Sequence, residues 1–137
     1  MKFPQWLDVY GDQSFRDKKC PKETVEQITL FAELRKNYPE IGAIAIHVRN
    51  EGKRTWEQAA MHKAEGMISG ACDIIIPGSP SLVMELKRRD HTVSKWQPGQ
   101  LDYLEASRAA GSYVCVALGW QAALNAILTW WTGQQNG

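Results

Sequence analysis

Apolar residues recur along the chain with two different periods, and together these periods predict an α/β fold. Apolar residues at helical spacing, with Pro39 ending the first helix and Pro98 opening the third, predict helices over 23–37, 56–66, 98–110 and 120–131. Short, continuous apolar runs bounded by turn residues predict strands over 42–48, 72–76, 82–87 and 113–118. This order of elements is typical of a small mixed β-sheet with helices on both faces.

The length of 137 residues is that of one domain, so we expect a single domain over 1–137. Residues 1–22 follow neither period and predict an irregular N-terminal extension. A hydrophobic fraction of 44% with 23% charged residues excludes a disordered or fibrous chain. No apolar run is long enough for a membrane span, and the first residues lack the apolar core of a secretion signal.

The three cysteines show no CxxC spacing, which argues against a zinc site. Cys72 and Cys115 lie within predicted strands and are expected to be buried free thiols, whereas Cys20 precedes Pro21 and could be exposed. Free thiols are typical of a reducing compartment, so we expect a cytoplasmic protein that does not contact a membrane. A net charge of +1 does not by itself indicate nucleic-acid binding, so any such partner must be recognised by local charge.

The candidate chemistry lies on the two strands that flank the turn Pro77-Gly78-Ser79-Pro80. Because side chains alternate along a strand, Leu82, Met84 and Leu86 should share one face, and Val83, Glu85 and Lys87 the other. Folding the hairpin about its turn brings Asp73 opposite Met84 or Glu85. We therefore expect Asp73 and Glu85 to converge.

Two carboxylates a few ångströms apart repel each other unless a cation lies between them. Oxygen ligands without sulfur suit Mg²⁺ or Mn²⁺, and Lys87 could reach a water or phosphate oxygen beside that metal. The alternative is that Glu85 and Lys87 form an ion pair on an edge strand and that Asp73 only begins a strand.

A third carboxylate could come from the start of the first helix. Glu23 shares the inward side of this helix with Leu30 and Leu34, while Glu26 lies nearer the boundary of the apolar stripe, which also includes Ile28. Glu23 could complete a metal site, or it could only interact with the positive end of the helix dipole.

These residues, together with further segments of the chain, occur in an order that resembles the VRR-NUC family of the PD-(D/E)XK nuclease superfamily. The matching positions are 23–27, 50–54, 66–74, 85–87, Gln100 and Gly111. The resemblance covers about residues 23–128, and Cys72 stands where the family usually has a small residue or proline.

The resemblance implies a PD-(D/E)XK restriction-endonuclease-like core and a Mg²⁺- or Mn²⁺-dependent DNA endonuclease. Small stand-alone members are similar to phage or prophage proteins that cut branched DNA, such as Holliday junctions, as homodimers. By resemblance Asp73, Glu85 and the backbone carbonyl of Leu86 bind the metal, and Glu23, or alternatively Glu26, contributes directly or through water. Lys87 activates the attacking water, and Gln100 supports the site.

Local positive charge identifies candidate DNA contacts. The residues expected to contact DNA are Asn50, Lys53, Arg54, Arg88, Arg89 and Lys95. His47 could face the same cleft, although a histidine on a buried strand is more often part of the core. Trp130 and Trp131 are adjacent and cannot both be buried on one helix face, which suggests either a homodimer contact or one partly exposed tryptophan. The alternatives in function are a nuclease for flaps, single strands or a specific sequence, and a catalytically silent DNA-binding protein on the same fold.

Overall fold

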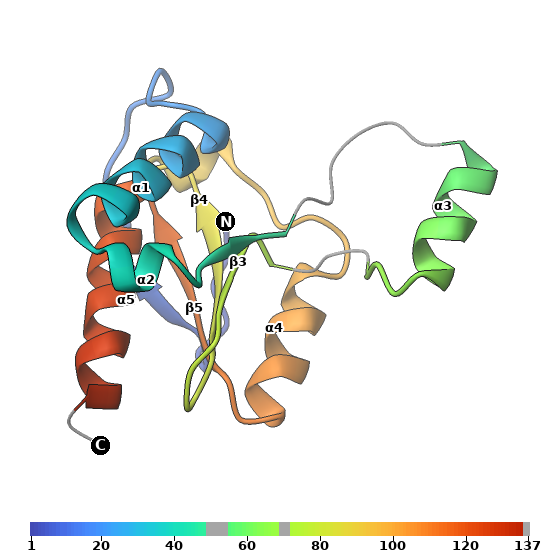
Figure 1. Ribbon diagram of the computed structural model, residues 1–137. Helices are drawn as coiled ribbons and strands as arrows, with labels where there is room; N and C mark the ends of the chain where they lie inside the picture. The colour runs from blue at the N-terminus through green and yellow to red at the C-terminus, as the bar shows by residue number, and fades with distance from the viewer. Residues whose placement is uncertain (49–54, 69–71, 136–137) are drawn as a thin grey trace.

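The computed structural model describes residues 1–48, 55–68 and 72–135. Its strands form one mixed sheet in the order β1-β5-β4-β3-β2. The strands are β1 (Asp8–Tyr10), β2 (Ile46–His47), β3 (Ile74–Ile76), β4 (Leu82–Lys87) and β5 (Tyr113–Leu118). The helices are α1 (Glu23–Asn37), α2 (Pro39–Gly42), α3 (Trp56–Ala64), α4 (Gln100–Ala109) and α5 (Trp120–Gln135), with a 3₁₀ turn at His91–Val93. The predicted α/β class, with a mixed sheet flanked by helices, is confirmed (Figure 1).

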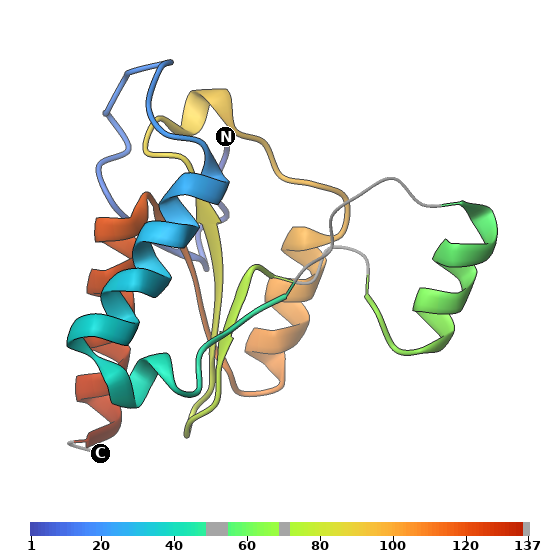
Figure 2. The same ribbon diagram turned by 45° about the horizontal axis from the view of Figure 1, so that its top comes forward.

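The sheet lies between two layers of helices. Helices α1 and α5 cover one face and α4 covers the other, which is clearest when the molecule is turned (Figure 2). On the α1 and α5 side, Leu82, Met84 and Leu86 join a core with residues of both helices. Val83 points to the α4 side, where it packs in a second cluster with Leu104. The predicted alternation along β4 is therefore correct, and Glu85 and Lys87 belong to the α4 side.

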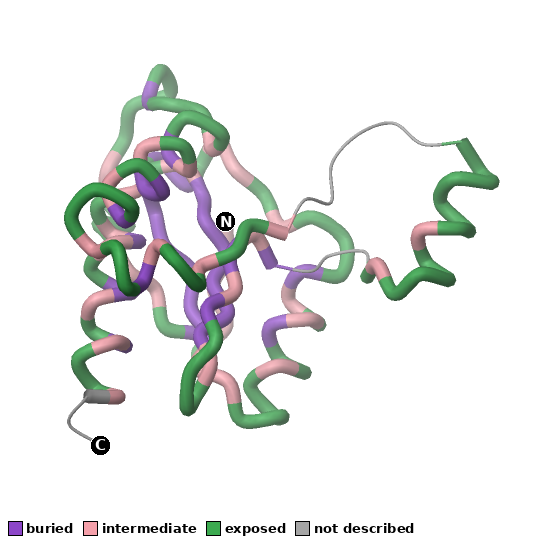
Figure 3. Tube along the Cα trace, in the orientation of Figure 1, coloured by how far each residue is buried: buried purple, intermediate pink, exposed green. Residues whose placement is uncertain are grey.

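Strand β4 is the central strand of the sheet. It pairs parallel with β5 and antiparallel with β3, and all six of its residues are buried (Figure 3). Two hydrogen bonds hold the turn before β4 against α5. Trp130 Nε1 donates to the carbonyl of Pro80, and Ser79 N donates to Gln134 Oε1. The alternative of an edge-strand ion pair is therefore wrong, because both edges of β4 are occupied.

The region 42–48 differs from its prediction as a buried strand. Pro39 opens the short helix α2, and regular strand geometry is limited to Ile46–His47 at the edge of the sheet. Ile46 is 52% exposed and His47 is also exposed. The run of apolar residues was the only signal there, and it does not distinguish a central strand from an edge strand.

The first 22 residues also hold more structure than expected, because they include strand β1. Asp8 pairs with Cys115 in a parallel register, so β1 extends the sheet beyond β5. A strand of three residues has no readable period, and its partner lies about a hundred residues away. Cys20, within this region, is buried, as are Cys72 and Cys115.

Two helices depart from the expected burial. On α1, Leu30, Phe31 and Leu34 are buried as expected, but Ile28 is 65% exposed. Helix α3 has no buried residue and stands away from the sheet (Figures 1 and 3). It begins with a capping box between Thr55 and Gln58. Within the described ranges, no helix has the length and apolar character that crossing a membrane requires.

Candidate active site

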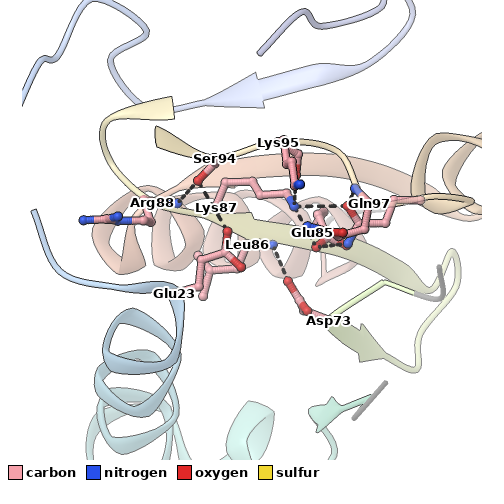
Figure 4. A network of polar contacts seen from close by, with 10 residues as sticks. Glu23, Asp73, Glu85, Leu86, Lys87, Arg88, Ser94, Lys95 and Gln97 are labelled. Carbon is pink, nitrogen blue, oxygen red and sulfur yellow. Dashed lines mark hydrogen bonds and ion pairs between the residues drawn. The ribbon is translucent and has the colours of Figure 1, made fainter. Parts of the chain in front are cut away.

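The β3–β4 hairpin brings the predicted acidic residues together. Ile74 pairs with Met84, so the register continued by one position places Asp73 opposite Glu85. Asp73 Oδ2 accepts a hydrogen bond from Leu86 N at 3.1 Å, which ties this carboxylate to the backbone of β4 (Figure 4). The tight turn at 77–80 sets this register, which is why the sequence alone could predict the approach.

Glu85 is a buried carboxyl group, and its surroundings only partly stabilise the ionised form. Its side chain is 1% exposed, and Oε1 accepts a hydrogen bond from Gln100 Nε2 at 2.8 Å. The other oxygen, Oε2, is buried without a hydrogen-bond partner among the described residues. Burial, followed by the charge of Asp73, raises the pKa of Glu85 well above its ordinary value of 4.5. A cation beside Oε2 would oppose both effects.

The Lys87 ammonium is enclosed beside Glu85. Nζ donates to the carbonyl of Lys95 at 2.9 Å and to Gln100 Oε1 at 3.0 Å, and it lies 3.7 Å from Glu85 Oε1. Its side chain is only 2% exposed, and the ring centroid of Trp96 lies 5.6 Å from Nζ. A buried ammonium needs such partners because water cannot solvate it.

Gln100 forms hydrogen bonds with both Glu85 and Lys87. Its amide nitrogen donates to Glu85, while its amide oxygen accepts from Lys87 Nζ and from Gln97 N at 2.8 Å. Gln100 is the first residue of α4, and Gly99 before it has a positive φ of 87° that glycine adopts without strain. The start of α4 thereby holds the Gln100 side chain against β4.

The two glutamates of α1 have different surroundings. Glu23 Oε1 accepts a hydrogen bond of 3.4 Å from the hydroxyl of Ser94, and its charge contributes to the raised pKa of Glu85 (Figure 4). Glu26 is buried on the other side of the helix start, where Oε2 accepts from Trp120 N at 2.5 Å and caps α5. Of the two, Glu23 is therefore the one directed toward the candidate site.

A pocket of about 390 Å³ adjoins Glu23. Its lining residues are Glu23, Thr92, Val93, Ser94, Lys95 and Gln97. Most of this wall comes from the connection between β4 and α4, which also supplies the Lys95 carbonyl to Lys87. Ser94 and Trp96 were not predicted as site residues, because nothing in the local sequence of an irregular connection shows which side chains turn toward the sheet.

The carboxylate oxygens of Asp73 and Glu85 suit a small divalent cation that prefers oxygen ligands and retains several bound waters. Within the part of the chain that the structure describes, no group of at least three His, Cys, Asp or Glu side chains could hold a metal ion. Asp73 and Glu85 nevertheless provide two adjacent carboxylates, one with an unused buried oxygen. Mg²⁺ is commonly held by one or two carboxylates together with water and substrate phosphate, so the residues present are compatible with it.

The predicted DNA contacts have varied surroundings. Arg88 donates to the backbone carbonyls of Lys18 and Pro21 at 3.3 and 3.2 Å, and also to that of Cys20, so its guanidinium is engaged within the protein. Arg89 stacks on the ring of Phe15 with 4.0 Å between its Cζ atom and the centroid. The Lys95 side chain is exposed.

The other predicted contacts, Asn50, Lys53 and Arg54, lie outside the described residues. His47 is not the core histidine that we expected. It is exposed at the sheet edge, and its Nδ1 is 3.0 Å from the carbonyl oxygen of Asp73.

The fold is a mixed sheet between two layers of helices, and in this chain Glu85 and Lys87 lie on its central strand. Among solved structures, the chain is similar to a "VRR_NUC domain protein" with a TM-score of 0.66 and 22% sequence identity. The match covers 80% of this chain and 88% of the other. No family model and no curated protein matches the chain. At this identity the likeness shows a shared fold, and the resemblance predicted from the sequence motifs is confirmed at that level.

Proposed function

We propose that this protein is a divalent-metal-dependent endonuclease that hydrolyses phosphodiester bonds in DNA, with a preference for branched DNA. The observation that carries the proposal is the buried oxygen of Glu85, without a partner among the described residues, beside Asp73 and Lys87. The same arrangement lies on a fold shared with a protein named for the VRR_NUC domain. A buried carboxyl group beside a second, half-buried one costs stability, which is typical of a site kept for chemistry rather than for folding.

We assign each residue of the site one role. Asp73, Glu85 and the Leu86 carbonyl would hold Mg²⁺ or Mn²⁺, with Glu23 acting directly or through water. Such a bound ion supplies a water of lowered pKa and polarises the phosphoryl group. Lys87 places positive charge where negative charge develops on the phosphate, and orients the attacking water.

Gln100 keeps Lys87 and Glu85 at a fixed separation through its two hydrogen bonds. The Lys87 ammonium must retain that place while it acts on the phosphate. In this role Gln100 supports the catalytic groups without contacting the substrate.

DNA would approach along the β2 edge and the pocket beside Glu23. Lys95, Arg89, Asn50, Lys53 and Arg54 are the proposed contacts to phosphates, which give affinity without reading a base sequence. Arg88 stays a prediction, although its guanidinium already has backbone partners. Such contacts suit recognition of DNA shape rather than of a base sequence, and branched DNA is the substrate that we propose on this ground.

A cleavage assay on a four-way junction tests the proposal. The protein is incubated with the junction, a flap, a duplex and a single strand, in Mg²⁺ or Mn²⁺ and with a chelator. We expect metal-dependent cutting of the junction that Lys87→Met and Asp73→Asn reduce by about 10²–10³-fold, because each removes a charge at the reacting phosphate. Lys36→Met, at an exposed position on α1, is the matched control and should cut like the parent.

The outcomes are distinct. Cutting by both variants at the parent rate refutes the assigned roles. Preferential cutting of a flap or single strand keeps the chemistry but refutes the preference for branched DNA. DNA binding without metal binding or cutting identifies a catalytically silent DNA-binding protein.

A homodimer is also part of the proposal, because two sites would cut two strands of a junction. Trp130 is buried, at 5% exposure, and Trp131 is half-buried, so α5 offers less free apolar surface than its sequence suggested. The exposed large apolar residues include Ile46, Trp56 and Met61, on β2 and α3. Light scattering at micromolar concentration tests this point, and a monomer mass would exclude the dimer.

A cytoplasmic setting is the remaining part of the proposal. The free thiols of Cys20, Cys72 and Cys115 are all buried and are compatible with a reducing compartment.

A further inference from the structure

The first residues of the chain lie against the connection that carries one wall of the candidate site. We call residues 2–21 the N-terminal strap and residues 88–99 the β4–α4 connection. Trp96 Nε1 donates to the Lys2 carbonyl at 2.8 Å, and His91 Nε2 contacts the Gln13 carbonyl at 3.1 Å. The motif resemblance begins only at residue 23, so it gave the strap no role.

Two polar anchors hold the far end of the strap. Asp17 N donates to Asp90 Oδ2 at 3.0 Å, and Arg88 donates to the carbonyls of Lys18, Cys20 and Pro21. Asp90 is fully buried and also accepts from the backbone and hydroxyl of Thr92. These bonds join the strap to the beginning of the connection, directly after β4.

Trp96 is the point at which the strap meets Lys87. Its ring faces the Lys87 ammonium with 5.6 Å between Nζ and the centroid, and its Nε1 donates to the strap at Lys2. The ring also packs against the apolar cluster on the α4 side of the sheet. The ring of Phe3 packs on it edge to face, with 6.3 Å between centroids and an interplanar angle of 83°. The residue before it, Lys95, supplies the carbonyl that accepts from Lys87 Nζ.

Neighbouring groups enclose the Lys87 ammonium. Lys87 has two hydrogen-bond acceptors, Lys95 O and Gln100 Oε1, and the π-face of Trp96. An aromatic face attracts a cation more strongly when water is excluded, so the ring both shields and holds the amine. Movement of the ring would open the amine to water and allow the Lys95 carbonyl to move with it.

We propose that Trp96 is a positioning residue, which the N-terminal strap holds over Lys87 so that the ammonium keeps its place and is covered from bulk solvent on the side of the ring. The consequence for cleavage rests on the proposed function, but the shielding itself does not. Trp96 need not touch the substrate for this role.

Amine labelling of the intact protein tests the shielding directly. The folded protein is treated briefly with a small amine-acetylating reagent, and the modified lysines are quantified by peptide mass spectrometry, with exposed Lys36 as internal reference. Lys87 should be protected in the parent. In Trp96→Leu, which keeps apolar bulk without the aromatic face, Lys87 labelling should rise by about tenfold or more through local opening.

Two further variants make the result specific. Trp96→Phe retains an aromatic face but loses the bond to Lys2, and it should restore most of the protection. Trp131→Leu is the matched control, because Trp131 is a half-buried tryptophan on α5 that packs on the other face of the sheet, and it should leave Lys87 protected. Unchanged Lys87 labelling in Trp96→Leu, or an equal rise in Trp131→Leu, overturns the proposal.

Steady-state cleavage then separates this proposal from the nuclease function. If the parent cuts DNA, Trp96→Leu should lower kcat with little change in KM, and Trp96→Phe should recover it. If the parent cuts DNA and Trp96→Leu has the same kcat as the parent, the positioning role is also overturned. A parent that does not cut refutes the proposed function, and the labelling pattern alone then decides whether Trp96 shields Lys87.

Discussion

Replacing Glu85 by glutamine should stabilise the protein while abolishing its proposed activity. Glu85 is 1% exposed, and its Oε2 atom has no hydrogen-bond partner among the described residues. An unsatisfied buried acceptor costs about 1–3 kcal/mol, and a charged one costs more. Glutamine keeps an oxygen for the Gln100 amide, removes the charge and places a donor beside Asp73. We therefore expect Glu85→Gln to raise the free energy of unfolding by about 1–3 kcal/mol at pH 7.

The stabilisation of the protein by Glu85→Gln should increase with rising pH. Because the pKa of Glu85 is raised above 4.5 in the folded protein, the native state keeps a proton that the unfolded state releases as the pH rises past that value. Stability of the parent therefore falls with rising pH until Glu85 also ionises in the native state. The advantage of Glu85→Gln should be small at pH 4 and largest above the native pKa.

Thermal unfolding in a chelator measures the effect. For a chain of this length, 1 kcal/mol corresponds to roughly 4 °C in Tm, so the expected rise is about 4–12 °C. Glu105→Gln, at an exposed position on α4, is the matched control and should leave Tm unchanged. Adding Mn²⁺ at about 100 times its Kd should stabilise the parent by about 2.7 kcal/mol and leave Glu85→Gln unaffected. An equal or lower Tm for Glu85→Gln at pH 7–8 would refute the reasoning.

Two further predictions concern the frame of the site. Glu26→Ala should lower the free energy of unfolding by about 1–2 kcal/mol, because it removes the cap on Trp120 N; urea unfolding measures the loss, and no loss would refute the capping role. Gly78→Ala should cost about 1–3 kcal/mol, because the added Cβ would lie 2.6 Å from the Trp130 ring. The second loss should appear as a lower Tm, and an unchanged Tm would show that α5 moves freely away from the turn.

Much of the fold and part of the site could be predicted because their signals are local. The helix Glu23–Asn37 and the strands Leu82–Lys87 and Tyr113–Leu118 have the predicted bounds. Their periodicity and their flanking turn residues lie within the segments themselves. The approach of Asp73 to Glu85 was also predictable, because a short hairpin links residues on facing strands through a turn that can be read directly.

Contacts between segments far apart in the sequence explain which parts of the fold and site were not predicted. The strand Asp8–Tyr10 pairs with β5, which lies about a hundred residues further along the chain. The exposure of Ile46 follows from the place of β2 at the other edge of the sheet. Likewise, nothing in the sequence near Glu26 indicates that its carboxylate meets Trp120 N.

The sequence by itself determined the order of the longer helices and of strands β3 to β5, the two faces of β4, and the placement of an acid and a lysine on one of those faces. Only the tertiary structure decided which glutamate of α1 faces the site, that Arg88 is held by backbone carbonyls, and that Trp96 covers Lys87. The physical reason is the distance along the sequence over which each kind of interaction acts. Periodicity and turns act over a few residues, whereas the partners of a buried charge are brought to it by segments far apart in the chain.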